Sequence, residues 1–326
     1  MEESKKIEEK FKQGTLYAEI LKELHPQPAD QDKKVREILA KIEEHDPKRK
    51  RKVFSYMANF NDGRSQIGVS DIAPIGDILA SFGTVDYLDL IIHSPGGDAN
   101  VAEKIIQICR EHSKKEFRVI IPNMAKSAAT LIALGADSIV MGHCSELGPI
   151  DAQVLISVSG INRFISAQAF IDARDNLLKE IERRQGEGKE ITQFLQQIAT
   201  LNIPFIEECD RLMRYSNDMA TRWLSRCMLK KTFKDPTERA GKALEIANYF
   251  SSTEKHLTHA KLINIEECKK LGLNVTVLNK EDVLWKLIWE YYVRTEIRFG
   301  IVTDMSRIKI LETSEGTLVA QAPMMK

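Results

Sequence analysis

The sequence of 326 residues lacks the features that would assign it to several specialised classes of protein. It has no net charge, because 47 basic residues balance 47 acidic ones, so its composition favours neither nucleic acid nor an anionic membrane surface as a partner. It has no apolar run near the roughly 18 residues that span a bilayer. Its first residues alternate in charge and contain no apolar signal-peptide core. We therefore expect a cytoplasmic, globular protein without a membrane span.

Cysteines and clustered metal ligands are also scarce. The five cysteines show no CxxC spacing, which predicts reduced thiols rather than a disulfide framework or a zinc site. His256 and His259 stand three residues apart but have no third ligand near them in the sequence. The stretch HSPGGDAN at 93–100 lacks the Gly-Lys-Ser/Thr ending of a phosphate loop. These absences predict a protein that uses no metal and no other cofactor.

Short β-rich runs alternate with stretches of helical periodicity from residue 53 onward. The runs VFSYMANF, YLDLIIHS, FRVIIPN and DSIVMG are separated by segments such as NVAEKIIQICREH, where Val101, Ile105 and Ile108 share one helical face. This alternation predicts βαβ units and a mainly parallel sheet. Residues 165–250 have helical patterns almost throughout. The expected fold class is therefore α/β, with a large helical insertion.

The two ends of the chain differ from this central part. Residues 1–50 are heavily charged and have the periodicity of helices. Beyond Glu281, an aromatic-rich helical run precedes two alternating segments, RIKIL and TLVAQ, and the intervening ETSEG predicts a hairpin. We expect charged helices at 1–50, a central domain at 51–280, and a C-terminal helix and β-hairpin at 281–326.

A glycine-rich turn lies between a predicted strand and a predicted helix at 93–100. Gly96 and Gly97 permit backbone dihedrals closed to other residues and leave their N–H groups unshielded. The start of the next helix adds a partial positive charge at the same place. Such a turn can donate hydrogen bonds to the oxyanion that develops during acyl transfer. It can equally be a tight βα turn that merely requires glycine, so the turn alone does not decide the function.

A serine heads the next predicted helix, in the stretch IPNMAKSAATLIALGAD at 121–137. Small residues around Ser127 would let a substrate backbone approach, and the Ala128 N–H would point the same way as that of Gly97 if the two βα units are neighbours. Serine is also a preferred helix N-cap. Ser127 is therefore either a cap or a nucleophile, and the glycine turn that precedes it favours the nucleophile.

Three stretches resemble the Clp-type serine peptidases, and most closely the serine dehydrogenase proteinase family. They are LDLIIHSPGGDANVAEKI, VIIPNMAKSAATLIALGADSIVMGHCSELGPIDAQ, and a distal segment in which THAK at 258–261 precedes INIEECKKLGLNV. The resemblance covers about residues 50–275. It implies a Clp/crotonase-like fold of stacked βα units, a serine endopeptidase that acts on peptides or proteins, and a homo-oligomer.

The same resemblance implies roles for individual residues. Ser127 would be the nucleophile, and the glycine turn of Gly96 and Gly97 together with Ala128 would supply the oxyanion hole. At the position after the serine where Clp-type peptidases place a histidine, this chain has LGPIDAQ, which contains Asp151 and no histidine. The residue that accepts the serine proton is therefore left open.

Three residues are candidates for the proton-transfer machinery. Histidine titrates near neutral pH, so His259 in the distal motif is suited to act as a base. Lys179 stands at a separation from the serine similar to that in the Ser–Lys dyads of signal peptide peptidases, but a lysine base requires burial or a second cation. Asp151 could orient a histidine or cap its own loop. We rank His259 first and Lys179 second.

Two other functions are compatible with these motifs. A crotonase-type acyl-CoA enzyme also stabilises an anion with two backbone N–H groups, but it needs no serine at position 127. A non-catalytic interaction protein could keep a peptidase-like core as an assembly scaffold, and the missing histidine after Ser127 gives this reading some support. The prediction is nevertheless a serine peptidase that works through an acyl-enzyme on Ser127.

Overall fold

A computed structural model describes residues 15–24, 30–158, 160–300 and 305–323 of the chain. The chain forms two compact units, of which the first comprises Met1–Leu147 and Asn264–Lys326 and the second comprises Gly148–Ile263. The segments predicted at 1–50 and 281–326 fall within the first unit, and the helical segment 165–250 falls within the second. The first fourteen residues of the predicted N-terminal helices lie outside the described residues.

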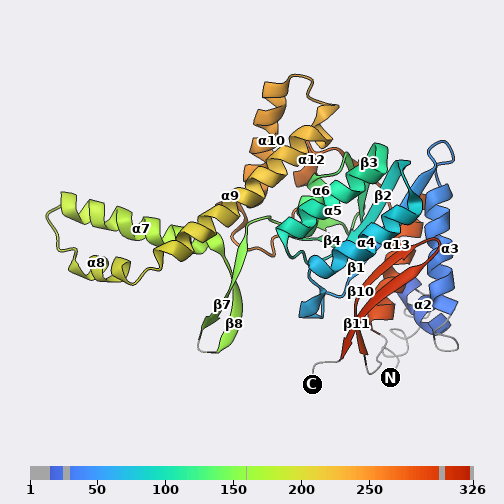
Figure 1. Cartoon of the computed structure of the whole chain (residues 1–326), viewed down its shortest axis with the longest axis horizontal. Helices are drawn as coiled ribbons and strands as arrows, with labels where there is room; N and C mark the ends of the chain where they lie inside the picture. Colours follow the sequence, from blue (N-terminus) through green and yellow to red (C-terminus); the bar gives the residue numbers. More distant parts are fainter. Residues whose placement is uncertain (1–14, 25–29, 159, 301–304, 324–326) are drawn as a thin grey trace, which may run out of the picture. The chain divides into compact units, whose positions relative to one another are not determined.

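The first unit is built on a seven-stranded sheet in the order β11-β10-β1-β2-β3-β5-β9 (Figure 1). Five strands are parallel: β1 (Arg51–Ala58), β2 (Val85–His93), β3 (Ser113–Ile121), β5 (Ser138–Met141) and β9 (Val275–Val277). The hairpin of β10 (Met305–Thr313) and β11 (Thr317–Pro323) joins antiparallel through β1. The predicted α/β class, the mainly parallel sheet and the C-terminal hairpin are all confirmed.

Helices cover both faces of this sheet. One face carries α2 (Leu16–Leu24), α3 (Asp30–Glu44) and α13 (Val283–Phe299), and the opposite face carries α4 (Ile72–Phe82), α5 (Ala99–His112) and α6 (Ala128–Leu134). On the first face, Leu39 and Trp285 belong to the same buried cluster as Val53 and Ile91 of the sheet. Parallel strands covered on both sides are apolar nearly throughout, which explains the continuous apolar runs of β1 and β5.

Short elements complete the first unit beyond the sheet and its covering helices. They are η1 (Gly63–Ser65), η2 (Val69–Asp71), β4 (Met124–Ala125), β6 (Glu146–Leu147) and α12 (Ile265–Lys270). β4 and β6 pair in parallel as a separate small sheet. Apart from α12, which precedes β9, these elements follow the carboxyl ends of β1, β3 and β5, which is the edge where open α/β sheets bind ligands.

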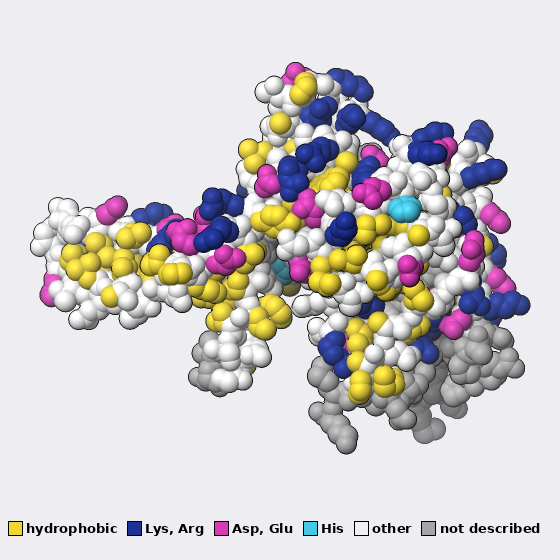
Figure 2. Space-filling model, viewed as in Figure 1, with side chains coloured by type: hydrophobic (Ala, Val, Ile, Leu, Met, Phe, Trp, Pro, Cys, Tyr) yellow, Lys and Arg dark blue, Asp and Glu magenta, His cyan; other side chains and the backbone are white. Residues whose placement is uncertain are grey.

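The second unit is mainly helical. It contains α7 (Ala167–Gly186), α8 (Thr192–Ala199), α9 (Ile203–Arg226), η3 (Met228–Lys230), α10 (Pro236–Ser251) and α11 (Thr253–His256), which confirms the large helical insertion. It also contains an unpredicted hairpin of β7 (Gln153–Val158) and β8 (Ile161–Ser166). Figure 2 shows apolar side chains gathered on α7 and α8, where Leu178 and Leu195 are exposed. No described helix of either unit is long and apolar enough to span a bilayer.

Candidate active site

The turn after β2 lies directly against the turn that precedes α6. The Ser94 N–H donates to the Met124 carbonyl at 3.0 Å, and the Lys126 N–H donates to the Ser94 carbonyl at 3.0 Å. A Cβ on Gly96 would lie 2.6 Å from the Lys126 carbonyl oxygen and 2.7 Å from Ser127 Cβ. Gly96 also has a φ of 98°, so this position requires glycine for both space and conformation. The two strand-to-helix corners therefore meet.

The two consecutive glycines differ in what their N–H groups do. The Gly96 N–H donates to Ser94 Oγ at 3.1 Å. Gly97 is approached by the backbone of Ile67, whose N–H donates to the Gly96 carbonyl at 2.7 Å. Among the described residues, no hydrogen bond is found for the N–H of Gly97 or for that of Ala128. The N–H groups of Gly97 and Ala128 are thus the donors without an acceptor among the described residues. Gly96 instead lets the two turns lie close together.

Ser127 does not cap the helix that it precedes. Its φ of 50° and ψ of −116° lie outside the conformations common for side-chain-bearing residues, and its hydroxyl makes no capping hydrogen bond to α6. Ser127 and Leu257 are the two non-glycine residues with positive φ in the described ranges. Such a conformation costs about 1–3 kcal/mol and tends to occur at functional sites. The side chain of Ser127 is half-buried, so its oxygen is not sealed in the core.

Side chains behind the serine turn hold it in place. Lys126 forms an ion pair with Glu146, and its Nζ donates to the Leu147 carbonyl at 3.2 Å. The Met124 N–H donates to His93 Nδ1 at 3.2 Å. Burial lowers the pKa of His93 to about 3, so this histidine is neutral at physiological pH and accepts a hydrogen bond. His93 is therefore a structural support of the turn.

The second unit brings Asp151 and His259 together. Asp151 Oδ1 lies 2.7 Å from His259 Nδ1, and the side chains are 4% and 20% exposed, respectively. A carboxylate only accepts hydrogen bonds, so Nδ1 carries the proton and Nε2 is left as an acceptor. An aspartate holds the histidine of a serine-peptidase triad in this same tautomer. Of the two predicted roles of Asp151, the structure favours the orientation of a histidine.

Backbone geometry within the second unit explains how residues so distant in sequence meet. The Ile150 N–H donates to the Phe250 carbonyl at 2.9 Å, which places the Asp151 segment beside the end of α10. Leu257, with a φ of 61°, then terminates α11 in a left-handed conformation. The chain turns at this residue, and His259 follows in the loop beyond it.

A small cavity of about 180 Å³ adjoins the Asp151–His259 pair. Ser166, Thr253 and His256 are among its other lining residues. Lys179 does not line this cavity, and its side chain is exposed on α7. The second unit therefore gives Lys179 no burial, which is one of the two conditions that can make a lysine act as a base.

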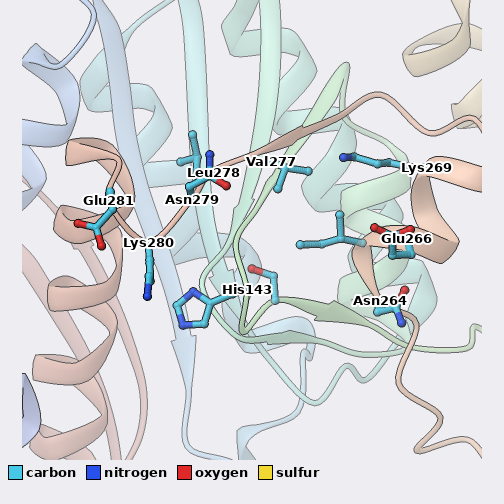
Figure 3. Close-up of a pocket in the computed structure, with 11 residues that line it drawn as sticks. His143, Asn264, Glu266, Lys269, Val277, Leu278, Asn279, Lys280 and Glu281 are labelled. Carbon is cyan, nitrogen blue, oxygen red and sulfur yellow. The ribbon is translucent and has the colours of Figure 1, made fainter.

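A larger cavity, of about 680 Å³, lies in the first unit but contains none of the predicted site residues. Figure 3 shows its labelled side chains, which come from the turn after β5, from α12 and the residue before it, and from the end of β9 and the segment that follows. His143 lies at this cavity and contacts the Trp285 ring edge-on at 5.8 Å between centroids. The hydroxyl of Ser145 accepts from the Gly142 N–H at 2.8 Å and donates to the Ile121 carbonyl, so it is already engaged. Size alone does not make this cavity the site of acyl transfer.

Two further observations concern residues of other kinds. Within the described residues, no three His, Cys, Asp or Glu side chains come together in a way that could hold a metal ion. Burial raises the pKa of Cys109, Cys144 and Cys268 above that of a free thiol, which disfavours the nucleophilic thiolate form. Ser127 thus remains the candidate nucleophile.

Residues 83–161 match the family model of the ClpP-like SDH-type serine proteinases. This match confirms the resemblance inferred from the sequence motifs. It covers the glycine turn, Ser127 and Asp151, but it includes neither His259 nor the C-terminal hairpin.

Two proteins of Methanocaldococcus jannaschii are similar to this chain. The uncharacterized protein MJ0137 is 30% identical over 197 residues, which are 60% of this chain and 56% of that protein. The uncharacterized protein MJ1495 is 48% identical over 67 residues, which are 21% of this chain and 23% of that protein. The chain thus spans little more than half of one relative and under a quarter of the other.

Solved structures also show partial likeness. A mutant of the 1510-N membrane-bound stomatin-specific protease is 16% identical, with a TM-score of 0.39, over 67% of this chain and 76% of that chain. ClpP1 from Listeria monocytogenes is 12% identical, with a TM-score of 0.35, over 72% of this chain and 94% of that chain. At this level of similarity, neither structure decides the function of the chain.

Proposed function

We propose that this chain is a serine endopeptidase that cleaves peptide bonds through an acyl-enzyme on Ser127. The observation that supports the proposal most strongly is the contact between the two corners. A half-buried serine with a strained backbone and no capping role lies within 2.7 Å of where a Gly96 Cβ would be. Beside it are the N–H groups of Gly97 and Ala128, for which no acceptor is found among the described residues. The family match over residues 83–161 supports the same chemistry.

In the proposed acylation step, Ser127 Oγ attacks the scissile carbonyl carbon. The carbonyl oxygen becomes an oxyanion, which accepts hydrogen bonds from the N–H groups of Gly97 and Ala128. Preformed donors of this kind are worth about 3 kcal/mol each in acyl transfer. Because these amides belong to two turns locked together, they need little reorganisation when the charge develops.

Proton transfer is assigned to the Asp151–His259 pair in this proposal. His259 Nε2 accepts the Ser127 hydroxyl proton and later donates it to the leaving amine. Asp151 keeps the proton on Nδ1 and stabilises the imidazolium that forms. Water then attacks the acyl-enzyme with His259 as the base. Lys179 ranks below His259 because it is exposed on α7.

The proposal also covers the substrate class, the oligomeric state and the cellular location of the enzyme. Its substrate class is a peptide or protein, because the family is one of proteinases. The homo-oligomer and the cytoplasmic location inferred from the sequence belong to the same proposal.

Labelling with a fluorophosphonate probe tests the nucleophile directly, because the probe bonds covalently to an activated serine. We expect the wild-type protein to be labelled and Ser127→Ala to remain unlabelled. Ser145→Ala is the matched control, since Ser145 is a serine of the same unit at the edge of the larger cavity, and it should keep its labelling. Cleavage of a peptide library, followed by mass spectrometry, should depend on Ser127 in the same way.

The alternatives give different results in this experiment. A crotonase-type acyl-CoA enzyme would show no labelling and would bind an acyl-CoA ester, whereas a scaffold would show neither labelling nor peptide cleavage. Labelling that persists in Ser127→Ala would assign the nucleophile to another residue and end the proposal.

A further inference from the structure

A buried ion pair joins the C-terminal hairpin to the segment that follows β1. Lys309 of β10 and Asp71 of η2 are each 4% exposed, and Lys309 Nζ lies 2.8 Å from both carboxylate oxygens of Asp71. The Tyr56 hydroxyl donates to Asp71 Oδ2 at 2.8 Å. Two charges removed from water in this way persist only when their geometry is well satisfied. The pair therefore holds two distant segments of the chain at one point.

Asp71 in turn fixes the loop that precedes it. The Gly68 N–H donates to Asp71 Oδ2 at 2.9 Å, and the Asp71 N–H donates to the Gly68 carbonyl at 2.9 Å. The first bond is the side-chain half of a capping box, and the second is the backbone bond of the η2 turn, because Gly68 has no side chain of its own. Together these bonds set the position of the next residue toward the N-terminus, Ile67.

Ile67 is the residue that contacts the glycine turn. Its N–H donates to the Gly96 carbonyl at 2.7 Å, and its carbonyl accepts from the Asp98 N–H at 2.9 Å. A Cβ on Gly97 would lie 2.3 Å from the Ile67 carbonyl oxygen, so the backbone of Ile67 leaves no room for a side chain at Gly97. Gly97 is thus held between two hydrogen bonds that both end on Ile67.

Other contacts tie the same loop to the same hairpin. The Asn59 N–H donates to the Ile308 carbonyl at 2.9 Å, and Asn59 Nδ2 donates to the Arg307 carbonyl at 3.1 Å. The Ser306 hydroxyl donates to Asp62 at 3.1 Å. The hairpin lies outside residues 83–161, which match the family model. Support for the turn therefore comes from a part of the chain beyond that match.

We propose that Asp71 and Lys309 are positioning residues for the oxyanion turn. Lys309 anchors the Asp71 carboxylate, Asp71 fixes Gly68, and Ile67 then holds Gly97 so that its N–H faces the site of Ser127. This inference rests on the proposed peptidase function for its catalytic consequence, whereas its structural part concerns only the first unit. A carboxylate is suited to the task because it accepts several hydrogen bonds at one point.

The test uses the full chain with Lys309→Met, which removes the charge and shortens the unbranched side chain by only one heavy atom. Hydrogen exchange should become faster at the Ile67 and Asp98 amides, because the loop loses its anchor. With the fluorophosphonate probe, kinact should fall at least roughly tenfold with KI unchanged, since a displaced donor weakens only the transition state. Asp71→Asn is the second variant and should show the same changes if Lys309→Met does not fold.

Glu312→Gln is the matched control. Glu312 is a fully buried residue of β10 that pairs with Arg298 Nη1 at 2.8 Å, and Arg298 belongs to α13 rather than to the loop that reaches Ile67. This substitution should lower the melting temperature as Lys309→Met does. It should leave kinact, and exchange at Ile67 and Asp98, as in the wild-type protein.

The outcomes separate this inference from the peptidase proposal. Unchanged exchange at Ile67 and Asp98 in both Lys309→Met and Asp71→Asn would overturn the positioning role, as would equal effects in Glu312→Gln. Faster exchange at these amides with a labelled wild type but an unchanged kinact would also overturn it. A wild-type protein that is never labelled would instead overturn the peptidase proposal, and the exchange result would then decide the positioning role by itself.

Discussion

The two units of the molecule hold their candidate catalytic groups by different means. In the first unit, Gly96 and Ser127 are placed by backbone contacts between adjacent turns that follow strands of one sheet. In the second unit, Asp151 and His259 meet through one side-chain hydrogen bond between residues 108 positions apart. Backbone placement follows from the sheet itself, whereas a single side-chain bond depends on how helices and loops pack. The position of Ser127 is therefore fixed by more contacts than that of His259.

His93 of the first unit and His259 of the second unit also differ in their surroundings. His93 is 1% exposed, lies in the first unit, and is kept neutral because burial lowers its pKa to about 3. The side chain of His259 is 20% exposed and is bonded to a carboxylate. The buried ring serves the backbone as an acceptor, whereas the partly exposed ring contacts a carboxylate.

Replacing His259 should have the largest effect after loss of the nucleophile itself. In His259→Ala, Ser127 has no base, and we expect kcat for peptide cleavage to fall ~10⁶-fold. Steady-state kinetics against a cleaved peptide measures this. His256→Gln, three residues away, is the control and should lower stability more than activity. Comparable kcat values in wild type and His259→Ala would show that His259 of the second unit is not the base.

Asp151→Asn should have the next largest effect. The amide can no longer hold the His259 proton on Nδ1, so the wrong tautomer is populated, and we expect kcat to fall ~10⁴-fold with little change in KM. Asp172→Asn alters a neighbouring carboxylate that lines the same cavity and should retain activity. If both variants behave alike, the Asp151–His259 bond has no special role.

Gly96→Ala tests the contact between corners in the first unit. A methyl group there would meet the Lys126 carbonyl and Ser127 Cβ, so one of the two turns must shift, and we expect a loss of ~10²-fold in the rate of fluorophosphonate labelling. Gly76→Ala in α4 has nothing within 4 Å of the added carbon and should raise stability by about 0.5–1 kcal/mol. Unchanged labelling of Gly96→Ala would show that the corners tolerate separation.

The buried His93 of the first unit should make the free energy of unfolding fall at acidic pH. Burial lowers the pKa of His93 to about 3 from 6.5, so between these values only the unfolded chain binds the proton. Its contribution to stability is complete above 6.5 and is lost as the pH falls. We expect His93 to reduce the free energy of unfolding by about 1.4 kcal/mol at about pH 5.5 relative to about pH 7.5.

Denaturant titrations at both pH values, on wild type and on His93→Asn, measure this loss. The asparagine keeps an acceptor for the Met124 N–H but does not titrate. Comparison with the variant is needed because burial raises the pKa of Glu296 to about 7, and this carboxyl changes stability in the opposite direction. Identical pH dependence in the two proteins would contradict the assigned state of His93.

Local patterns in the sequence predicted most of the fold. The parallel sheet followed from apolar runs alternating with helical periods, and the hairpin of β10 and β11 followed from two alternating runs around ETSEG. The β7–β8 hairpin was not predicted. Its segments VLISV and INRFIS lie beside helical segments, and the alternation of apolar and polar residues is their only strand signal. The attachment of β10 to β1 joins segments more than two hundred residues apart, which no local pattern encodes.

The residues of the candidate site differ in the same way, because some follow from local patterns and others only from the fold. Ser127, Gly96, Gly97 and Ala128 were predicted from short motifs, because a sharp strand-to-helix turn leaves its requirement for glycine and small residues in the sequence itself. The choice between His259 and Lys179 was left open, and the Asp71–Lys309 pair gave no signal at all. Their roles in catalysis stay predictions, but their surroundings could be known only from the folded chain.

By itself, the sequence determined the class of fold and the two turns, and it predicted Ser127 as the nucleophile. Tertiary structure decided which of the described backbone donors lack an acceptor, that Asp151 meets His259, and that Lys309 of the C-terminal hairpin meets Asp71. The physical reason is that turns are governed by dihedral and steric limits within a few residues. Side-chain pairing across the chain depends instead on packing and burial, which only the complete fold creates.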